Sequence, residues 1–280
     1  MEPSIELIRL DDSSAYLKQI DRAETGDELY DEFEENSEEV FAIREQDTVV
    51  GLLYLDDDTE AFLFVYIFPA YRNRGYGRLA LAAAERQLKS EPLSCIETLF
   101  ISGNETAKRF AQANGYTRTF ASACMQYDGK PFAEPGQNIR QYRDEDYPEA
   151  FALSAEAFHL MRVGTGCFPH STVAQPSEES RKRWADAAND EYVYVQNGEI
   201  IGYGRLDETE LDSVSIKPDK QGKGCGREFV RFLTDRILEK GEGEPTLWCV
   251  VGNNKARALY DSLGYSELYR EDFAEKRIGR

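Results

Sequence analysis

The stretch SVSIKPDKQGKGCG, residues 213–226, decides the fold. It opens with strand-forming residues, is interrupted by Pro218, and places three glycines before a helical pattern that starts at Arg227. Glycines in such a turn let backbone N–H groups point outward at the helix N-terminus, where they can bind an anion. The stretch therefore predicts an α/β fold with an anion site between a strand and a helix.

Two common nucleotide-binding motifs do not fit this turn. A P-loop needs Gly-Lys-Ser/Thr, whereas Gly226 is followed by Arg227. A Rossmann fingerprint needs a third glycine at position 227 after Gly222 and Gly224, and that position is also Arg227. The pyrophosphate of a nucleotide or coenzyme stays a candidate ligand, and the glycines could also serve the geometry of the turn alone.

The chain contains this turn twice, together with a later motif. FVYIFPAYRNRGYG, residues 64–77, aligns with residues 213–226 without a gap. NETAKRFAQANGY, residues 104–116, aligns in the same way with NNKARALYDSLGY, residues 253–265, and both pairs are offset by 149 residues. Because two motifs share one offset, the sequence indicates a duplication.

The two copies divide within residues 128–138, a segment rich in Pro and Gly. We therefore expect one domain over residues 1–133 and another over residues 134–280. In the second copy, residue patterns predict strands, a hairpin turn at Asn197 and helices that end at glycines. The predicted strands cover residues 191–196, 200–206, 210–217 and 246–251, and the predicted helices cover residues 147–158, 227–240 and 254–263.

Both motifs resemble those of the GCN5-related N-acetyltransferases, the GNAT superfamily. The shared pattern is Arg/Gln-x-x-Gly-x-Gly after a strand that ends at Pro, followed by Asn-x-x-Ala-x-x-Leu-Tyr-x-x-x-Gly-Tyr. The second copy has both motifs in order, while the first keeps the loop and departs from the later pattern. The resemblance implies an α/β protein of two tandem GNAT-like domains. Each would be a mixed, mostly antiparallel sheet with a splayed parallel strand pair and flanking helices.

The resemblance also implies where acetyl-coenzyme A (acetyl-CoA), the cosubstrate of this superfamily, binds. In the second copy, the pantetheine arm is expected beside Val214 and Ile216, with Asn253 near the pantetheine or the helix turn. The loop residues expected to hold the pyrophosphate are Gln221, Gly222, Lys223, Gly224, Cys225 and Gly226. The corresponding residues of the first copy are Arg72, Gly75 and Gly77.

Acyl transfer to an amine needs two proton positions. The amine must lose a proton before it attacks the thioester, and the leaving thiolate is stabilised when it gains one. By resemblance, Tyr260 lies near the thiol and is the expected acid, since tyrosine has a pKa of about 10. The expected base is Glu210, with a water chain as the alternative. The first copy has Ala111 and Ala61 at these positions, so we expect it to be degenerate and the second copy to be catalytic.

The charge balance narrows the range of partners. The chain has 280 residues, with 33 Lys+Arg against 52 Asp+Glu and a formal net charge of −19. Such a surface repels phosphate backbones and anionic membrane faces, so neither a nucleic acid nor a membrane is expected as a partner. It favours a cationic partner, although acidity can also serve solubility alone.

The cysteines and the N-terminal residues bear on location and metals. The 5 cysteines include no CxxC pair, so neither a disulfide framework nor a zinc site is expected. Cys167 and His170 could touch one metal ion, but two ligands without others do not favour a site, and no metal is assigned. The first residues lack the pattern of a signal peptide, so we expect a cytoplasmic protein.

Together these observations predict one function and leave one alternative. The predicted function is transfer of acetyl from acetyl-CoA to a primary amine of a small molecule or peptide, with a longer acyl group left open. The alternative is a non-catalytic sensor or scaffold that binds acyl-CoA. The acceptor site would include the insert at residues 160–191, where no motif identifies the acceptor. Two fused copies could form an internal pseudo-dimer, and the sequence does not define the oligomeric state.

Overall fold

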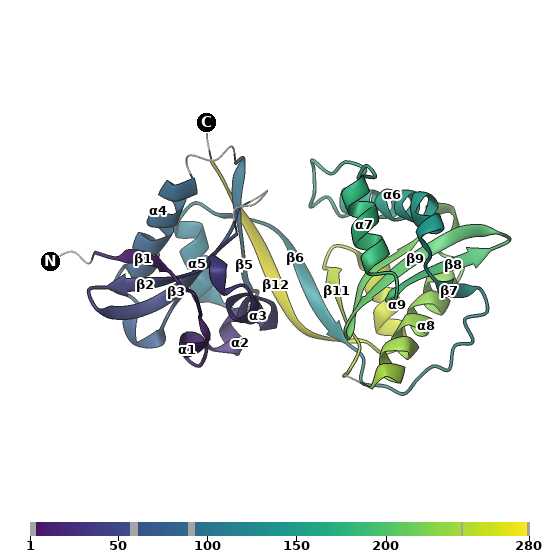
Figure 1. The fold of residues 1–280 in the computed structure, drawn as a ribbon, viewed down its shortest axis with the longest axis horizontal. Helices are drawn as coiled ribbons and strands as arrows, with labels where there is room; N and C mark the ends of the chain where they lie inside the picture. The colour runs from purple at the N-terminus through teal and green to yellow at the C-terminus, as the bar shows by residue number, and fades with distance from the viewer. Residues whose placement is uncertain (1–3, 57–60, 89–92, 242, 279–280) are drawn as a thin grey trace. The chain divides into compact units, whose positions relative to one another are not determined.

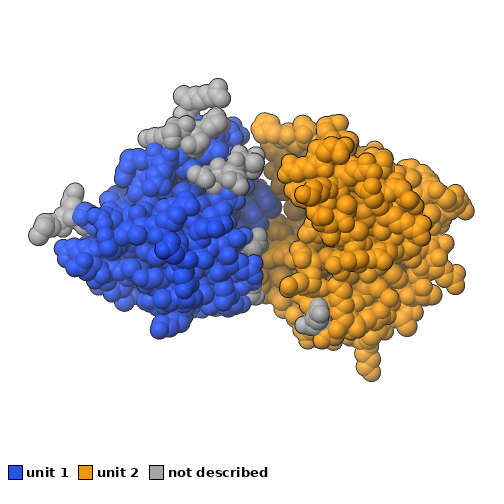
Figure 2. Space-filling view, in the orientation of Figure 1, with its two compact units in different colours: residues 1–120, 271–280 blue, residues 121–270 orange. Residues whose placement is uncertain are grey.

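The structure is a computed structural model that describes residues 4–56, 61–88, 93–241 and 243–278. The chain forms two compact units (Figure 2). Unit 1 consists of residues 1–120 and 271–280, and unit 2 consists of residues 121–270.

Unit 1 is a mixed sheet with helices on both faces (Figure 1). Neighbouring strands follow the order β1-β2-β3-β4-β5-β12. The strands are β1 (Glu6–Arg9), β2 (Val40–Glu45), β3 (Thr48–Asp56), β4 (Ala61–Ile67), β5 (Cys95–Ile101), the start of β6 (Thr117–Gln126) and the end of β12 (Ser266–Arg277). The helices are α1 (Ser14–Leu17), α2 (Arg22–Thr25), α3 (Asp27–Glu35), α4 (Tyr76–Leu88) and α5 (Glu105–Ala113), with 3-10 turns η1 (Ser37–Glu39) and η2 (Pro69–Tyr71).

The strands of unit 1 supply two cores because their side chains alternate between the faces of the sheet. Leu53 and Leu55 of β3 pack with α4 residues such as Leu88 on one face. Leu52 packs on the opposite face with Phe33 of α3. The sheet is thus covered by α4 on one side and by α1 and α3 on the other.

Unit 2 repeats this arrangement. Its neighbouring strands follow the order β6-β11-β10-β9-β8-β7. The remaining strands are β7 (Ile139–Gln141), β8 (Glu191–Gln196), β9 (Glu199–Asp207), β10 (Glu210–Ile216) and β11 (Thr246–Val250). The helices are α6 (Tyr147–Thr165), α7 (Glu178–Asp186), α8 (Cys225–Lys240) and α9 (Asn254–Leu263), with 3-10 turns η3 (Asp144–Asp146) and η4 (Pro218–Lys220).

Unit 2 also has one core on each face of its sheet. Leu211 of β10 packs with Phe229 and Leu233 of α8. Tyr203 of β9 packs on the opposite face with Leu153 of α6. The face that carries α6 and α7 is called the α6 face below, and the other is called the α8 face.

Each unit has a parallel strand pair that separates after its first residues. In unit 1, β4 pairs with β5 in register at Ala61 and Phe62. In unit 2, the described register joins β10 and β11 at Glu210 and Thr246. The other strand pairs with a described register are antiparallel. This mixed, mostly antiparallel sheet with a splayed parallel pair in each unit confirms the predicted fold class.

The compact units do not follow the expected boundaries at residues 133 and 134, because the copies exchange their last strands. Strand β6 ends the first copy, yet its residues 122–126 pair with β11 of the second copy. Strand β12 ends the second copy, yet its residues 271–277 pair with β5 of the first copy. Each unit is therefore completed by a strand from the other copy.

The predicted elements of the second copy agree with the structure to within about two residues, with one exception. Helix α6 extends to Thr165 instead of ending near residue 158. The insert also contains α7, which Ser177 caps by accepting a hydrogen bond from the backbone N–H of Ser180. The hairpin turn forms as predicted, with positive φ at Asn197 and Gly198. No helix in the described part of the chain is long and apolar enough to cross a membrane.

Candidate active site

The glycine-rich loop of unit 2 leads from β10 through η4 into α8. Gly222 and Gly224 have φ values of +72° and +93°, a backbone region that residues other than glycine rarely adopt. Gly224 is the N-cap of α8, and no side chain caps that helix end. The first N–H groups of α8 therefore point out of the helix with no intrahelical acceptor, which suits an anion.

The edge of β10 next to this loop has backbone groups that face away from β9. The N–H of Lys217 donates to the carbonyl oxygen of Ile201 at 2.9 Å. Because hydrogen-bonded positions alternate in an antiparallel ladder, the backbone groups of Val214 and Ile216 face the opposite edge, toward β11. Beyond the pair Glu210 and Thr246, no paired residues are described between β10 and β11. This edge can therefore pair with an extended ligand.

Gln221 fixes the start of the loop to this edge. Its side-chain Nε2 donates to the carbonyl oxygen of Ile216 at 2.9 Å. In unit 1, Nε of Arg72 donates to the carbonyl oxygen of Ile67 at the same distance. The first residue of the motif thus anchors the loop to the preceding strand in both copies.

Asn253 is the N-cap of α9, and its side chain accepts a hydrogen bond from the N–H of Ala256 at 3.3 Å. Asn104 caps α5 in the same way at 3.0 Å. The conserved spacing between the copies thus has a structural explanation in a helix cap. A contact between Asn253 and a coenzyme stays a prediction.

Tyr260 lies inside the core on the α8 face, with a relative exposure of 9%. Its ring centroid is 5.9 Å from that of Tyr265. Burial, with a smaller contribution from nearby Cys249, raises the pKa of Tyr260. The hydroxyl is therefore protonated throughout the neutral range, as a proton donor must be.

Glu210 begins β10 at the closed end of the splayed pair. It is half-buried, and strand alternation places it on the face opposite Leu211, which is the α6 face. A β-bulge follows between Leu211 and Ser213. Beside it, Arg205 forms ion pairs with Asp207 and Asp212 at 3.2 and 3.1 Å. The proposed base therefore has an acidic neighbourhood.

Unit 1 keeps the loop but not the two proton groups. Asn73 and Gly75 have φ values of +63° and +88°, at the positions of Gly222 and Gly224. A Cβ atom on Gly77 would lie 3.2 Å from the ring of Phe110. The counterparts of Tyr260 and Glu210 are alanines, and both are buried.

A group that the sequence did not reveal joins α2 of unit 1 to the loop. Nη1 and Nη2 of Arg72 both donate to the carboxylate of Glu24, at 2.8 and 2.5 Å. The hydroxyl of Tyr66 on β4 donates to the same carboxylate at 3.0 Å. Arg72 lowers the pKa of Glu24, so the carboxylate is ionised at neutral pH. Helix α2 also lies against β5. We call these three residues the α2 latch.

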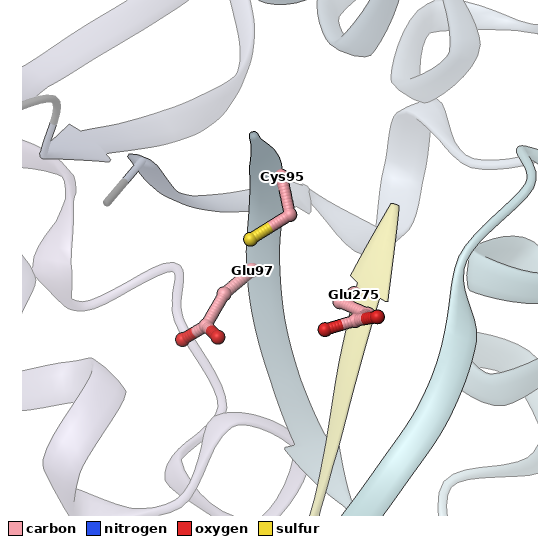
Figure 3. A group of neighbouring side chains, drawn as sticks. All are labelled: Cys95, Glu97 and Glu275. Atoms are coloured by element: carbon pink, nitrogen blue, oxygen red, sulfur yellow. The ribbon is translucent and has the colours of Figure 1, made fainter. Parts of the chain in front are cut away.

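One group of metal-ligating side chains occurs among the described residues (Figure 3). The ligand atoms of Cys95, Glu97 and Glu275 lie within 4.8 Å of one another. Sheet register alone accounts for this, because Glu97 is opposite Glu275 and Cys95 is two residues away on the same face of β5. Arg277 also pairs with Glu275 at 3.3 Å. We assign no metal to this group.

Comparisons with known proteins agree with this geometry. Residues 6–116 match the model of the Acetyltransferase (GNAT) family, and residues 198–274 match the FR47-like protein model. Two solved structures show the same fold. A GCN5-related N-acetyltransferase from Sphaerobacter thermophilus aligns over 86% of this chain and 81% of its own, with 17% identity and a TM-score of 0.69. A tandem GNAT protein from the clavulanic acid biosynthesis pathway aligns over 99% of each chain, with 16% identity and a TM-score of 0.66.

These features define a tandem protein with an acetyltransferase fold in each half. The two matches confirm the resemblance to the GNAT family that the motifs predicted. Both matched segments include a glycine-rich loop.

Curated relatives include two kinds of enzyme. The [Ribosomal protein bS18]-alanine N-acetyltransferase of Escherichia coli K12 is 34% identical over 97 residues, which cover 31% of this chain and 64% of the relative. The mycothiol acetyltransferase of Renibacterium salmoninarum is 25% identical over 223 residues, which cover 73% of this chain and 64% of the relative. The chain thus spans slightly less than two thirds of the length of either relative.

Proposed function

We propose that unit 2 transfers an acetyl group from acetyl-CoA to a primary amine, without a covalent enzyme intermediate. The observation that carries this proposal is that three features occur together in unit 2. They are the N-terminus of α8, which no described side chain caps, the edge of β10 beyond its described pairing with β11, and the buried Tyr260. The resemblance to the GNAT family supports the same reaction class.

The residues of unit 2 fit acetyl-CoA in two places. The first N–H groups of α8 would bind the pyrophosphate, aided by the helix dipole. The N–H and C=O groups of Val214 and Ile216 would pair with the amides of the pantetheine arm, as one more strand pairs with a sheet edge. An amide-bearing arm would thus occupy the space that β11 leaves beside β10.

The chemistry then needs one proton to leave and one to arrive. Glu210, or a water chain in its place, takes a proton from the ammonium form of the acceptor. The neutral amine nitrogen forms a bond to the thioester carbonyl carbon, and the carbon–sulfur bond breaks. Tyr260 gives its proton to the departing sulfur, and the acylated nitrogen releases its second proton, which returns through solvent to the Tyr260 phenolate. The products are an amide and free coenzyme A. Because the pKa of Tyr260 is raised, its proton is present at neutral pH.

The acceptor is proposed to be a cationic amine of a small molecule or peptide. Glu210, Asp207 and Asp212 lie together near the start of β10 with Arg205 as one counter-charge. Such a site favours an approaching ammonium group. The relatives act on an alanine amine of a ribosomal protein and in mycothiol acetylation, as their names state. We propose a reducing compartment such as the cytoplasm, since all five cysteines are free thiols.

Unit 1 is proposed to have no transferase activity of its own. Its loop has the shape needed for coenzyme, but it has no acid at Ala111 and no base at Ala61. The α2 latch also ties a helix to the loop and to β4. The first copy then serves as a structural partner, because its last strand, β6, supplies residues 122–126 to the sheet of unit 2.

The experiment is release of free thiol from acetyl-CoA with a panel of spermidine, glucosamine and a tetrapeptide with a free N-terminal alanine. The proposal expects amine-dependent release with at least one of them. Binding of acetyl-CoA without release across the panel would favour the alternative, a sensor or scaffold. The loop variant Gly224→Ala serves as a control for binding, because alanine is strained at φ +93°.

A further inference from the structure

A carboxyl group of unit 2 is buried on the α6 face, and no described cation lies at hydrogen-bond distance from it. Glu191, the first residue of β8, has a relative exposure of 0%. Its Oε1 accepts a hydrogen bond from the hydroxyl of Tyr203 at 3.0 Å. Its Oε2 is buried and has no hydrogen-bond partner within the described part of the chain. An ionised carboxylate in this position is strongly disfavoured.

The surroundings of Glu191 are aromatic and include a second unsatisfied atom. The buried hydroxyl of Tyr142 also has no hydrogen-bond partner among the described residues. The backbone N–H of Tyr142 donates to the carbonyl oxygen of Glu191 at 2.9 Å. Trp184 of α7 stacks on Tyr203 with a centroid separation of 4.2 Å and lies 5.8 Å from the ring of Tyr142. Helix α7 is thus packed directly over this cluster.

The charged groups around the cluster do not neutralise Glu191. Arg205 on β9 is a cation that lowers the pKa of Glu191, but its guanidinium group already forms ion pairs with Asp207 and Asp212. Two cations on neighbouring elements are paired with acids of η3. These pairs are Arg181 of α7 with Asp144, and Arg140 of β7 with Asp146.

The protonation states of this cluster follow from burial. Burial raises the pKa of Glu191 to about 7, with the Tyr203 hydrogen bond and Arg205 acting in the opposite direction. Burial also raises the pKa of Tyr142 and Tyr203, so both hydroxyls are neutral in the physiological range. One proton on the Glu191 carboxyl is therefore the only change of charge in this cluster near neutral pH.

We infer that Glu191 is a proton switch for α7. The neutral carboxyl group stays buried next to Tyr203, on which Trp184 stacks, and can use its own proton as a hydrogen-bond donor. When the proton leaves to solvent, the buried negative charge weakens the packing of Trp184 on Tyr203, and α7 loosens from the sheet. Helix α7 belongs to the insert on the α6 face, where Glu210 also lies. An effect on acceptor binding rests on the proposed function, whereas the switch itself does not.

The test is the fluorescence of Trp184 in a chain in which Trp248, the other of the 2 tryptophans, is replaced by Phe. Between pH 5.5 and 8.5 we expect one transition centred near pH 7. Glu191→Gln should abolish the transition and keep the Trp184 fluorescence at its low-pH value over the whole range, because glutamine cannot ionise. Tyr203→Phe should raise the midpoint, since it removes a hydrogen bond to the ionised form.

Controls separate this switch from a general effect of pH. Glu178→Gln changes an exposed carboxylate on the same helix and should keep the transition unchanged. The absence of a transition in the Trp248→Phe chain would overturn the inference, as would an unchanged transition in Glu191→Gln. If Glu191→Gln does not fold, an unchanged midpoint in Tyr203→Phe contradicts it instead. None of these readouts depends on turnover, so failure of the proposed acetyltransferase activity is distinguishable from failure of the switch.

Discussion

Unit 1 and unit 2 have the same loop geometry and different chemistry around it. Both loops leave a strand through a 3-10 turn and use positive φ at corresponding positions. Only unit 2 has a tyrosine and a carboxylate at the two proton positions, since unit 1 has Ala111 and Ala61. The comparison teaches that the same loop geometry can occur with or without the two proposed proton groups beside it.

A second difference concerns the residue that begins each loop motif. The side chain of Gln221 is described with one hydrogen bond, to β10, whereas the side chain of Arg72 makes the equivalent bond and also reaches Glu24 on α2. The position of Tyr66, which completes the α2 latch, is occupied in unit 2 by Ser215. The hydroxyl of Ser215 donates within the sheet, to the carbonyl oxygen of Tyr203. A helix is thus tied to the loop in unit 1 by groups that unit 2 replaces.

The strand exchange between the copies gives the largest expected effect. Cys124 of β6 lies opposite Trp248 of β11, and the two residues form a non-hydrogen-bonded pair of the antiparallel ladder. Trp248→Cys should therefore form a disulfide with Cys124 under mild oxidation, because such pairs have suitable Cα separations. Closing a loop of this length stabilises by about 5 kcal/mol in the chain-entropy model, measured as the difference in unfolding free energy between oxidised and reduced protein.

The control for this prediction is Trp248→Cys combined with Cys124→Ser. It should give no stabilisation on oxidation. If Trp248→Cys does not cross-link to Cys124 while the protein is folded, β6 does not complete the sheet of unit 2.

The base position gives the next largest effect. Glu210→Gln should lower kcat/KM for the amine by about 100-fold, the lower end of the range for general base catalysis. The KM for acetyl-CoA should stay the same, because Glu210 lies at the other end of β10 from the loop. The measurement is steady-state thiol release. A loss of less than about threefold would favour a water chain that does not need this carboxylate.

Matched alanine substitutions in the two loops compare the units directly. Gly224→Ala and Gly75→Ala each place alanine at a positive φ, +93° and +88°, which costs about 1–2 kcal/mol. Gly224→Ala should raise the KM for acetyl-CoA about tenfold, whereas Gly75→Ala should leave turnover unchanged. Equal losses of turnover in both variants would mean that the two loops contribute alike.

The smallest expected effect concerns the α2 latch. Glu24→Gln should lower the unfolding free energy by about 1 kcal/mol at pH 7, because the pair is only partly buried and solvent screens it. Arg72 lowers the pKa of Glu24 from 4.5, so the ionised form stabilises the fold above that pH. This stabilisation is lost as the pH falls below 4.5 toward the folded pKa. Wild type and Glu24→Gln should therefore converge in acid in denaturant titrations, and a difference that grows in acid would contradict the latch.

The sequence predicts the elements of the second copy well, because they depend on local patterns. The glycines at turns and the strand alternation are such local signals. The alternation in EYVYVQ even places Glu191 on the same face as buried Val193. That pattern could have revealed Glu191 as a buried acid.

The strand exchange and the α2 latch could not be predicted in this way. The alternation of β6 fits the edge of either β5 or β11, so it does not specify which strand is the partner. Glu24 is one of 52 acidic residues, and nothing in its neighbours points to Arg72, 48 positions away. Both features depend on long-range contacts that a duplicated pattern leaves ambiguous.

The central claim is that turnover belongs to unit 2. The most direct measurement compares thiol release from acetyl-CoA by Tyr260→Phe and by Arg72→Ala under the same conditions, with the amine that the wild type accepts. We predict a loss of about 100-fold for Tyr260→Phe, because the thiolate then leaves without its acid, and wild-type turnover for Arg72→Ala. Intact turnover in Tyr260→Phe together with loss of turnover in Arg72→Ala would contradict the claim.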